Sequence, residues 1–87
     1  MTDSVHISFD APATLRKWPS RNNERVAGGS SYLVREGTLD SCLRDFMAKP
    51  EPTRHLYEIH TPPQPPVITG ILSAHQIIEI TRLRSFL

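Results

Sequence analysis

The hydrophobic and polar positions of residues 39–48 repeat with the spacing of an amphipathic helix. Five apolar side chains fall at i, i+3, i+4, i+7 and i+8, namely Leu39, Cys42, Leu43, Phe46 and Met47. This spacing lines one face of a helix, while the polar side chains between them point away from it. Thr38 precedes the stripe as a natural N-cap, and Pro50 ends the helix because proline has no backbone N–H to donate. The pattern predicts a helix that faces the core.

Strand-like segments flank this helix on both sides. Residues 32–35 are rich in aromatic and aliphatic side chains, and residues 55–60 alternate so that His55, Tyr57 and Ile59 share the better core face. A helix that joins two strands within about 30 residues is typical of a β-α-β unit. We therefore expect these strands to be parallel with a right-handed connection, and an antiparallel pairing is the alternative.

The C-terminal third predicts a connector, a short strand and a second helix. Residues 61–66 are too rich in proline for a sheet and favour a stiff polyproline spacer, after which residues 67–71 suit a short strand. Ser73 and Gln76 have the spacing of a capping box, so the last helix is expected to begin at Ala74 and run to the end of the chain. Ile78 is expected on the side opposite the apolar face, which consists of Ile77, Ile80, Leu83, Phe86 and Leu87.

Hydrophobic residues are sparse before Gly29, and this divides the chain in two. Residues 1–29 have the composition of a flexible, basic N-terminal arm with one candidate strand at 5–9. Residues 30–87 are expected to form one β-α-β-β-α domain, since a chain of 87 residues supplies a single core. The predicted fold class is α/β or α+β: β-α-β and then β-α, in a short sheet with two helices on one face.

Composition limits the function classes. Cys42 is the single cysteine and lies on the apolar stripe, so we expect a small buried hydrophobic residue in a reducing compartment. The 10 Lys and Arg residues nearly balance the 9 Asp and Glu residues, which argues against a partner attracted by the charge of the whole surface. There is no apolar run of about 18 residues and no leader pattern, so a cytoplasmic protein without membrane attachment is expected.

One group of side chains raises the alternative of a small enzyme or a metal protein. Glu58 and His60 lie two apart on one strand face, and His75 begins the last helix, so the three could meet if the connector folds back. No HxxxH, HExxH, CxxC or GxSxG pattern is present, and no phosphate-binding glycine motif occurs. We therefore assign no catalytic residue, metal ligand or cofactor, and expect the protein not to be an enzyme.

The N-terminal arm carries a local excess of positive charge, which raises the alternative of nucleic-acid binding. Four cationic residues surround a tryptophan that could stack on a base; the candidate contacts are Arg16, Lys17, Trp18, Arg21 and Arg25. The opposing interpretations are a solvated tail, or an arm that Trp18 anchors to the core.

The preferred interpretation is a small non-enzymatic protein-protein interaction module that self-associates or binds another protein. The last helix carries an apolar residue off its main face and ends in two further apolar residues. The candidate interface therefore consists of Ile78, Arg82, Phe86 and Leu87, and a homodimer would use this patch on both copies.

Overall fold

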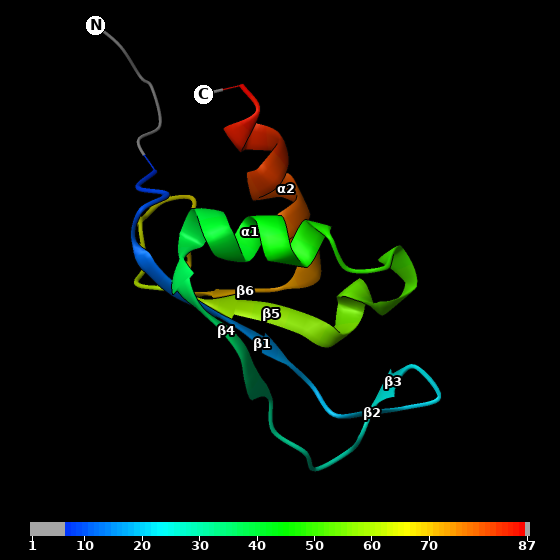
Figure 1. Ribbon diagram of the computed structural model, residues 1–87. Helices are drawn as coiled ribbons and strands as arrows, with labels where there is room; N and C mark the ends of the chain where they lie inside the picture. The colour runs from blue at the N-terminus through cyan, green and yellow to red at the C-terminus, as the bar shows by residue number, and fades with distance from the viewer. Residues whose placement is uncertain (1–6, 87) are drawn as a thin grey trace, which may run out of the picture.

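A four-stranded antiparallel sheet with two helices forms the fold in the computed structural model, which describes residues 7–86 (Figure 1). The strand order is β4-β1-β5-β6, and a separate two-stranded hairpin joins β2 and β3. In chain order the elements are β1 (Pro12–Lys17), β2 (Ser20–Arg21), β3 (Glu24–Arg25), β4 (Tyr32–Thr38), α1 (Leu39–Met47), the 3₁₀ helix η1 (Glu51–Leu56), β5 (Tyr57–His60), β6 (Ile71–Leu72) and α2 (Ala74–Arg84). The α+β alternative of the predicted fold class is the one observed.

Strand β1 lies in the interior of the sheet, which corrects the expectation that residues 1–29 stand outside the fold. It pairs with β4 on one side and β5 on the other, and its Ala13 and Leu15 are buried in the core. Only two apolar residues of β1 face the core, so its sequence alone does not resemble a strand. Its stability comes from two partners distant in the chain, a tertiary effect that local patterns do not reveal.

The later part of the expected arm, residues 18–29, also belongs to the fold. Asn22 and Asn23 adopt positive φ angles of 54° and 63° at the tip of the β2–β3 hairpin, as a tight hairpin turn requires. The candidate strand at 5–9 is not observed: its first two residues lie outside the described part of the chain, and residues 7–9 form coil and the start of a turn.

Helix α1 confirms the amphipathic pattern. Leu39, Cys42, Leu43 and Phe46 are all buried, and Thr38 caps the helix by accepting a hydrogen bond from the Ser41 N–H at 3.1 Å. Strands β4 and β5 are both antiparallel to β1, so they run in the same direction, as predicted. They are not neighbours, however, because β1 lies between them in a split β-α-β arrangement.

The segment after α1 differs in detail from the prediction. His55 belongs to η1, while Tyr57 and Ile59 of β5 do face the core. The proline-rich connector is not an extended spacer, because the backbone of Gln64 and Ile68 exchanges two hydrogen bonds of 2.9 Å across a turn at residues 65–67. The strand expected at 67–71 is reduced to β6, which pairs antiparallel with β5.

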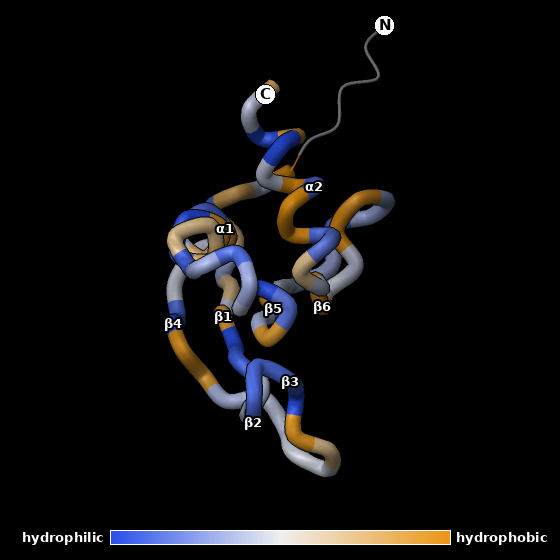
Figure 2. The backbone as a smooth tube through the Cα atoms, turned by 90° about the vertical axis from the view of Figure 1, so that its right-hand side faces the viewer, coloured by the Kyte–Doolittle hydropathy of each residue, from blue (hydrophilic) through white to orange (hydrophobic). Residues whose placement is uncertain are grey.

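Helix α2 begins with the predicted capping box of Ser73 and Gln76. Ile77 and Ile80 are buried, but Ile78 does not stand on the opposite side: it is half-buried and packs against the core. Ile78 lies about 100° from Ile77 around the helix, which places it at the flank of the buried face. Both helices cover the same face of the sheet, as predicted, and no helix lies on the other face, which we call the uncovered face (Figure 2).

Candidate functional site

The uncovered face of the sheet carries most of the polar chemistry. Alternation along β1 and β5 turns Leu15, Tyr57 and Ile59 toward the helices, so the residues between them point to the opposite side. The pairing register then sets Thr14 opposite His60 and Arg16 opposite Glu58. We call these four residues and the neighbouring Trp18 the open-face cluster.

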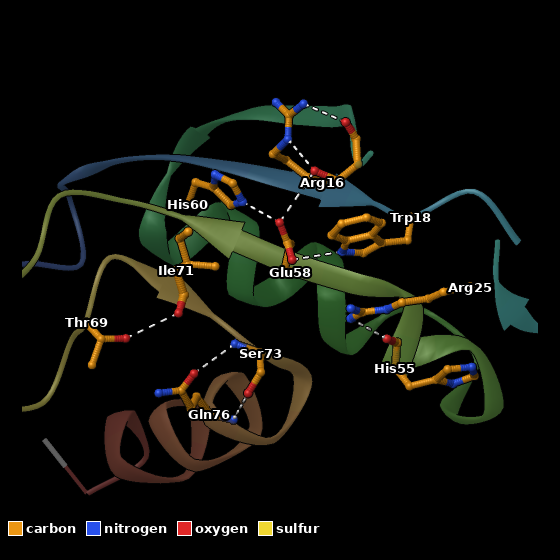
Figure 3. Close-up of polar contacts among 11 residues, drawn as sticks. Arg16, Trp18, Arg25, His55, Glu58, His60, Thr69, Ile71, Ser73 and Gln76 are labelled. Atoms are coloured by element: carbon orange, nitrogen blue, oxygen red, sulfur yellow. Dashed lines mark hydrogen bonds and ion pairs between the residues drawn. The ribbon is translucent and has the colours of Figure 1, made fainter. Parts of the chain in front are cut away.

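Glu58 is the centre of this cluster (Figure 3). The residue is only 9% exposed, and its carboxylate accepts a hydrogen bond from Trp18 Nε1 at 2.9 Å. His60 Nε2 lies 2.5 Å from the second carboxylate oxygen, and Ser31 Oγ lies 3.5 Å from the same oxygen. Arg16 donates to both the hydroxyl and the carbonyl of Ser31, at 2.9 and 2.8 Å. Residues from both ends of the 18–31 segment are thus tied to one buried anion.

The surroundings of Glu58 favour its charged form. Burial of the carboxyl raises its pKa, but the hydrogen bonds from His60 and Trp18 and the charges of His60 and Arg25 outweigh burial, so the pKa of Glu58 lies below its ordinary value. A carboxylate that holds an imidazole in this way can orient it as a proton acceptor. Here the same carboxylate also holds Trp18 and Ser31, which is the arrangement of a structural anchor.

The third member of the candidate acid-base or metal group lies elsewhere. Glu58 and His60 meet on the uncovered face, whereas His75 lies in the first turn of α2, on the side of the sheet that the helices cover. Within residues 7–86, no three His, Cys, Asp or Glu side chains are grouped so as to hold a metal ion. The grouping of His60, Glu58 and His75 is therefore wrong, because the connector turns without bringing α2 across the sheet.

The candidate nucleic-acid contacts lie at one end of the molecule, but on both faces of the sheet. The Arg25 guanidinium stacks on the Trp18 ring at 4.9 Å and donates to the His55 carbonyl at 3.0 Å. Lys17 points to the helix side, with its ammonium 5.9 Å from the centre of the Tyr57 ring. Arg21 is exposed in the hairpin. Trp18 is thus an anchor, but Glu58 holds it on the open face and not in the core that the opposing interpretation named.

Two further cations at this end were missed in the sequence. The Lys49 ammonium lies 5.6 Å from the centre of the Tyr57 ring that Lys17 also approaches, and Arg54 of η1 lies 5.9 Å from the Phe46 ring. Both follow α1 in sequence, far from the arm, and no local pattern links them to it. We call the six residues together the basic end: Arg16, Lys17, Arg21, Arg25, Lys49 and Arg54.

The candidate interface on α2 is not a continuous patch. Ile78 is engaged with the core, Arg82 pairs with Glu79 at 3.2 Å, and Phe86 is 86% exposed. Leu87 lies outside the described residues. Only Phe86 among the described three presents an apolar side chain fully to solvent.

A second exposed apolar surface lies on β4 and was missed in the sequence. Tyr32, Leu33 and Val34 are 47%, 52% and 38% exposed; Leu33 lies opposite Arg16 of the open face, and Tyr32 lies opposite Lys17 on the helix side, where α1 does not reach (Figure 1). The pairing with β1 shifts between Leu15 and Arg16, which leaves Val34 as the extra residue of a β-bulge. We call Tyr32, Leu33 and Val34 the β4 edge patch.

No protein-family model, curated protein or solved structure matches this chain. Among the described residues, no helix has the length and apolar character needed to cross a membrane.

Proposed function

We propose that the protein is a small non-enzymatic interaction module that self-associates through the β4 edge patch. The observation that carries this proposal is the run of three large apolar side chains exposed on an edge strand. Exposed apolar edge strands tend to pair with other chains, and natural proteins usually blunt them or cover them. A partner on this edge would bury side chains that the fold itself leaves in water.

A second copy of the chain suits this edge. Strand β4 continues from the patch into Arg35 and Glu36, so its charges cancel and two copies can approach without repulsion. A two-fold contact would set the same patch of each chain against the other. The bulge at Val34 divides the hydrogen-bonding edge into two short runs, so the contact would rest mainly on side chains.

The non-enzymatic part of the proposal is supported by what the open-face cluster does within the fold. Glu58 and His60 are the titratable pair best placed for acid-base chemistry, and the carboxylate is already bonded to Trp18 and Ser31. Its contacts fasten the 18–31 segment to the sheet. This role accounts for the buried charge without a substrate.

Sedimentation equilibrium at about 100 µM protein tests the proposal, since this is well above a micromolar dissociation constant. The unmodified protein is expected at twice the chain mass, and Leu33→Lys at the mass of one chain. Phe86→Lys is the matched control, because it changes an exposed apolar residue on α2 in the same way. If Phe86→Lys but not Leu33→Lys lost the dimer, the interface would lie at the end of α2 and not on β4. A monomeric parent would refute self-association.

A further inference from the structure

We propose that the basic end binds the phosphate backbone of nucleic acids without reading base sequence. This activity is separate from the contact at β4. It rests on how the fold brings together cations from three distant segments: Arg16 and Lys17 in β1, Arg21 and Arg25 in the hairpin, and Lys49 and Arg54 after α1.

The pairing of charges differs between the two ends of the molecule. Within residues 7–86, Lys49 is the one member of the basic end with a carboxylate within 4.0 Å, and its partner is Asp45 at 3.7 Å. Away from this end, Arg44 and Arg84 share Asp40 and Arg82 pairs with Glu79, while Arg35 is the one cation of the described residues outside the basic end without a carboxylate within 4.0 Å. The basic end therefore combines an excess of positive charge with five cations that, among the described residues, have no carboxylate within 4.0 Å.

Acidic residues at the basic end do not cancel this excess. Glu58 is buried, and its carboxylate is hydrogen-bonded to Trp18 and His60 within the fold. Glu24 lies opposite Arg21 in the hairpin, and Glu51 lies in the first turn of η1. With Asp45, which pairs with Lys49, three carboxylates besides the buried Glu58 thus oppose six cations.

The aromatic rings at this end already hold cations. Arg25 covers Trp18, and Lys17 and Lys49 both lie against Tyr57. Stacking on bases, which gives single-strand binders much of their affinity, is therefore not the expected mode. The guanidinium groups suit phosphate oxygens, and a contact of this kind depends on the backbone and not on the sequence.

The chemistry of the hairpin favours a nucleic acid over a protein partner. Residues 20–25 form a continuous exposed polar run, Ser-Arg-Asn-Asn-Glu-Arg, that ends at Val26. Protein interfaces usually need buried aromatic or aliphatic anchors, whereas nucleic-acid interfaces are more polar and positively charged.

Fluorescence anisotropy with labelled single-stranded and duplex DNA of mixed sequence, each strand about 20 nucleotides long, tests the proposal. Binding is expected with a dissociation constant of about 10–100 µM at 50 mM NaCl. About three phosphate contacts would give a slope of log K against log salt near −2 for the single strand, and steeper for the duplex. The DNA that binds more tightly, single-stranded or duplex, identifies the preferred form of the backbone. Binding of either form supports the proposal.

Arg21→Glu is the informative variant, because Arg21 is exposed and its side chain makes no hydrogen bond or ion pair within residues 7–86. We expect it to weaken binding about tenfold, with an unchanged thermal melt. Arg82→Glu is the matched control at the other end, and it should stay within twofold of the parent. Emission from Trp18, the single tryptophan, gives a second readout of binding beside Arg25.

Three results would overturn the proposal. These are no binding up to about 200 µM protein at 50 mM NaCl, equal weakening by Arg21→Glu and Arg82→Glu, or binding without salt dependence. Polyglutamate of matched length and charge is the competitor: if it displaces the DNA at equal concentration, an acidic protein is the better partner and the nucleic-acid assignment fails.

Discussion

Replacing Glu58 by glutamine should destabilise the protein by about 2 kcal/mol at neutral pH. Glutamine has nearly the same size, so the change removes the charge and leaves the packing. Hydrogen bonds to a charged group contribute about 1.5–3 kcal/mol each and neutral ones about 0.5–1.5 kcal/mol. Two good bonds, from Trp18 and His60, lose their charged acceptor, while the contact from Ser31 at 3.5 Å is too long to add much.

This loss should depend on pH in a definite direction. The pKa of Glu58 is lower in the folded protein than its ordinary value of 4.5, so the folded state favours the charged carboxylate. The stabilisation is therefore fully present above about pH 4.5 and disappears as the pH falls through the folded pKa. The difference between the parent and Glu58→Gln should shrink as the pH falls below about 4.5, because the carboxyl of the unfolded parent takes up a proton first and the folded one follows at lower pH.

Urea unfolding, followed by the emission of Trp18, measures both quantities. The parent and Glu58→Gln are compared at pH 7 and pH 3.5, and Glu36→Gln serves as the control because Glu36 is an exposed glutamate of the same sheet. Other carboxyl groups titrate alike in the parent and in Glu58→Gln, so they cancel in the difference. A gap of less than about 0.5 kcal/mol at pH 7, or one equally large at both pH values, would refute the anchoring role.

Three further changes test the packing. Leu15→Ala should cost about 2–5 kcal/mol in a denaturant melt, since Leu15 is fully buried in the interior strand; a loss below 1 kcal/mol would contradict the placement of β1. Gly37→Ala should cost about 1 kcal/mol, because a methyl group there would lie 2.6 Å from Ser41 Oγ and open the capping box of α1; an unchanged melt would show that the serine can move freely. Cys42 should react with a disulfide reagent only as fast as the protein opens, because its side chain is fully buried and burial also raises the pKa of its thiol; rapid labelling under native conditions would place it at the surface.

The sequence predicted the elements whose signals are local. The apolar stripe of α1 and the two capping residues of α2 each lie within one short segment of sequence, and the structure confirms both. The face of Tyr57 and Ile59 was readable for the same reason, because alternation needs only a few residues. Such patterns depend on the spacing of apolar residues and on the capping residues, and a single segment of sequence contains both.

Strand β1 could not be recognised in this way. Its two core residues, Ala13 and Leu15, stand among prolines, threonine and cations, and both of its partners are distant in the chain. The open-face cluster could not be predicted in full for the same reason, since its members come from distant parts of the chain. The sequence placed Glu58 and His60 on one strand face. Trp18 and Ser31, which contact Glu58, are separated from it by 40 and 27 positions in the chain.

The hairpin has a fixed conformation, and this lowers the entropy cost of binding a ligand through its charged side chains. A flexible arm would lose conformational entropy when it meets a ligand, whereas a docked hairpin has already lost it on folding. The docking contacts here are made by Trp18, by Asn23 with the Pro52 carbonyl, and by Arg25 with the His55 carbonyl. Arg21 takes no part in them, so it remains free at a fixed position. The contacts that hold the hairpin therefore also position an unpaired cation for an external anion, and this is why Arg21→Glu separates binding from folding.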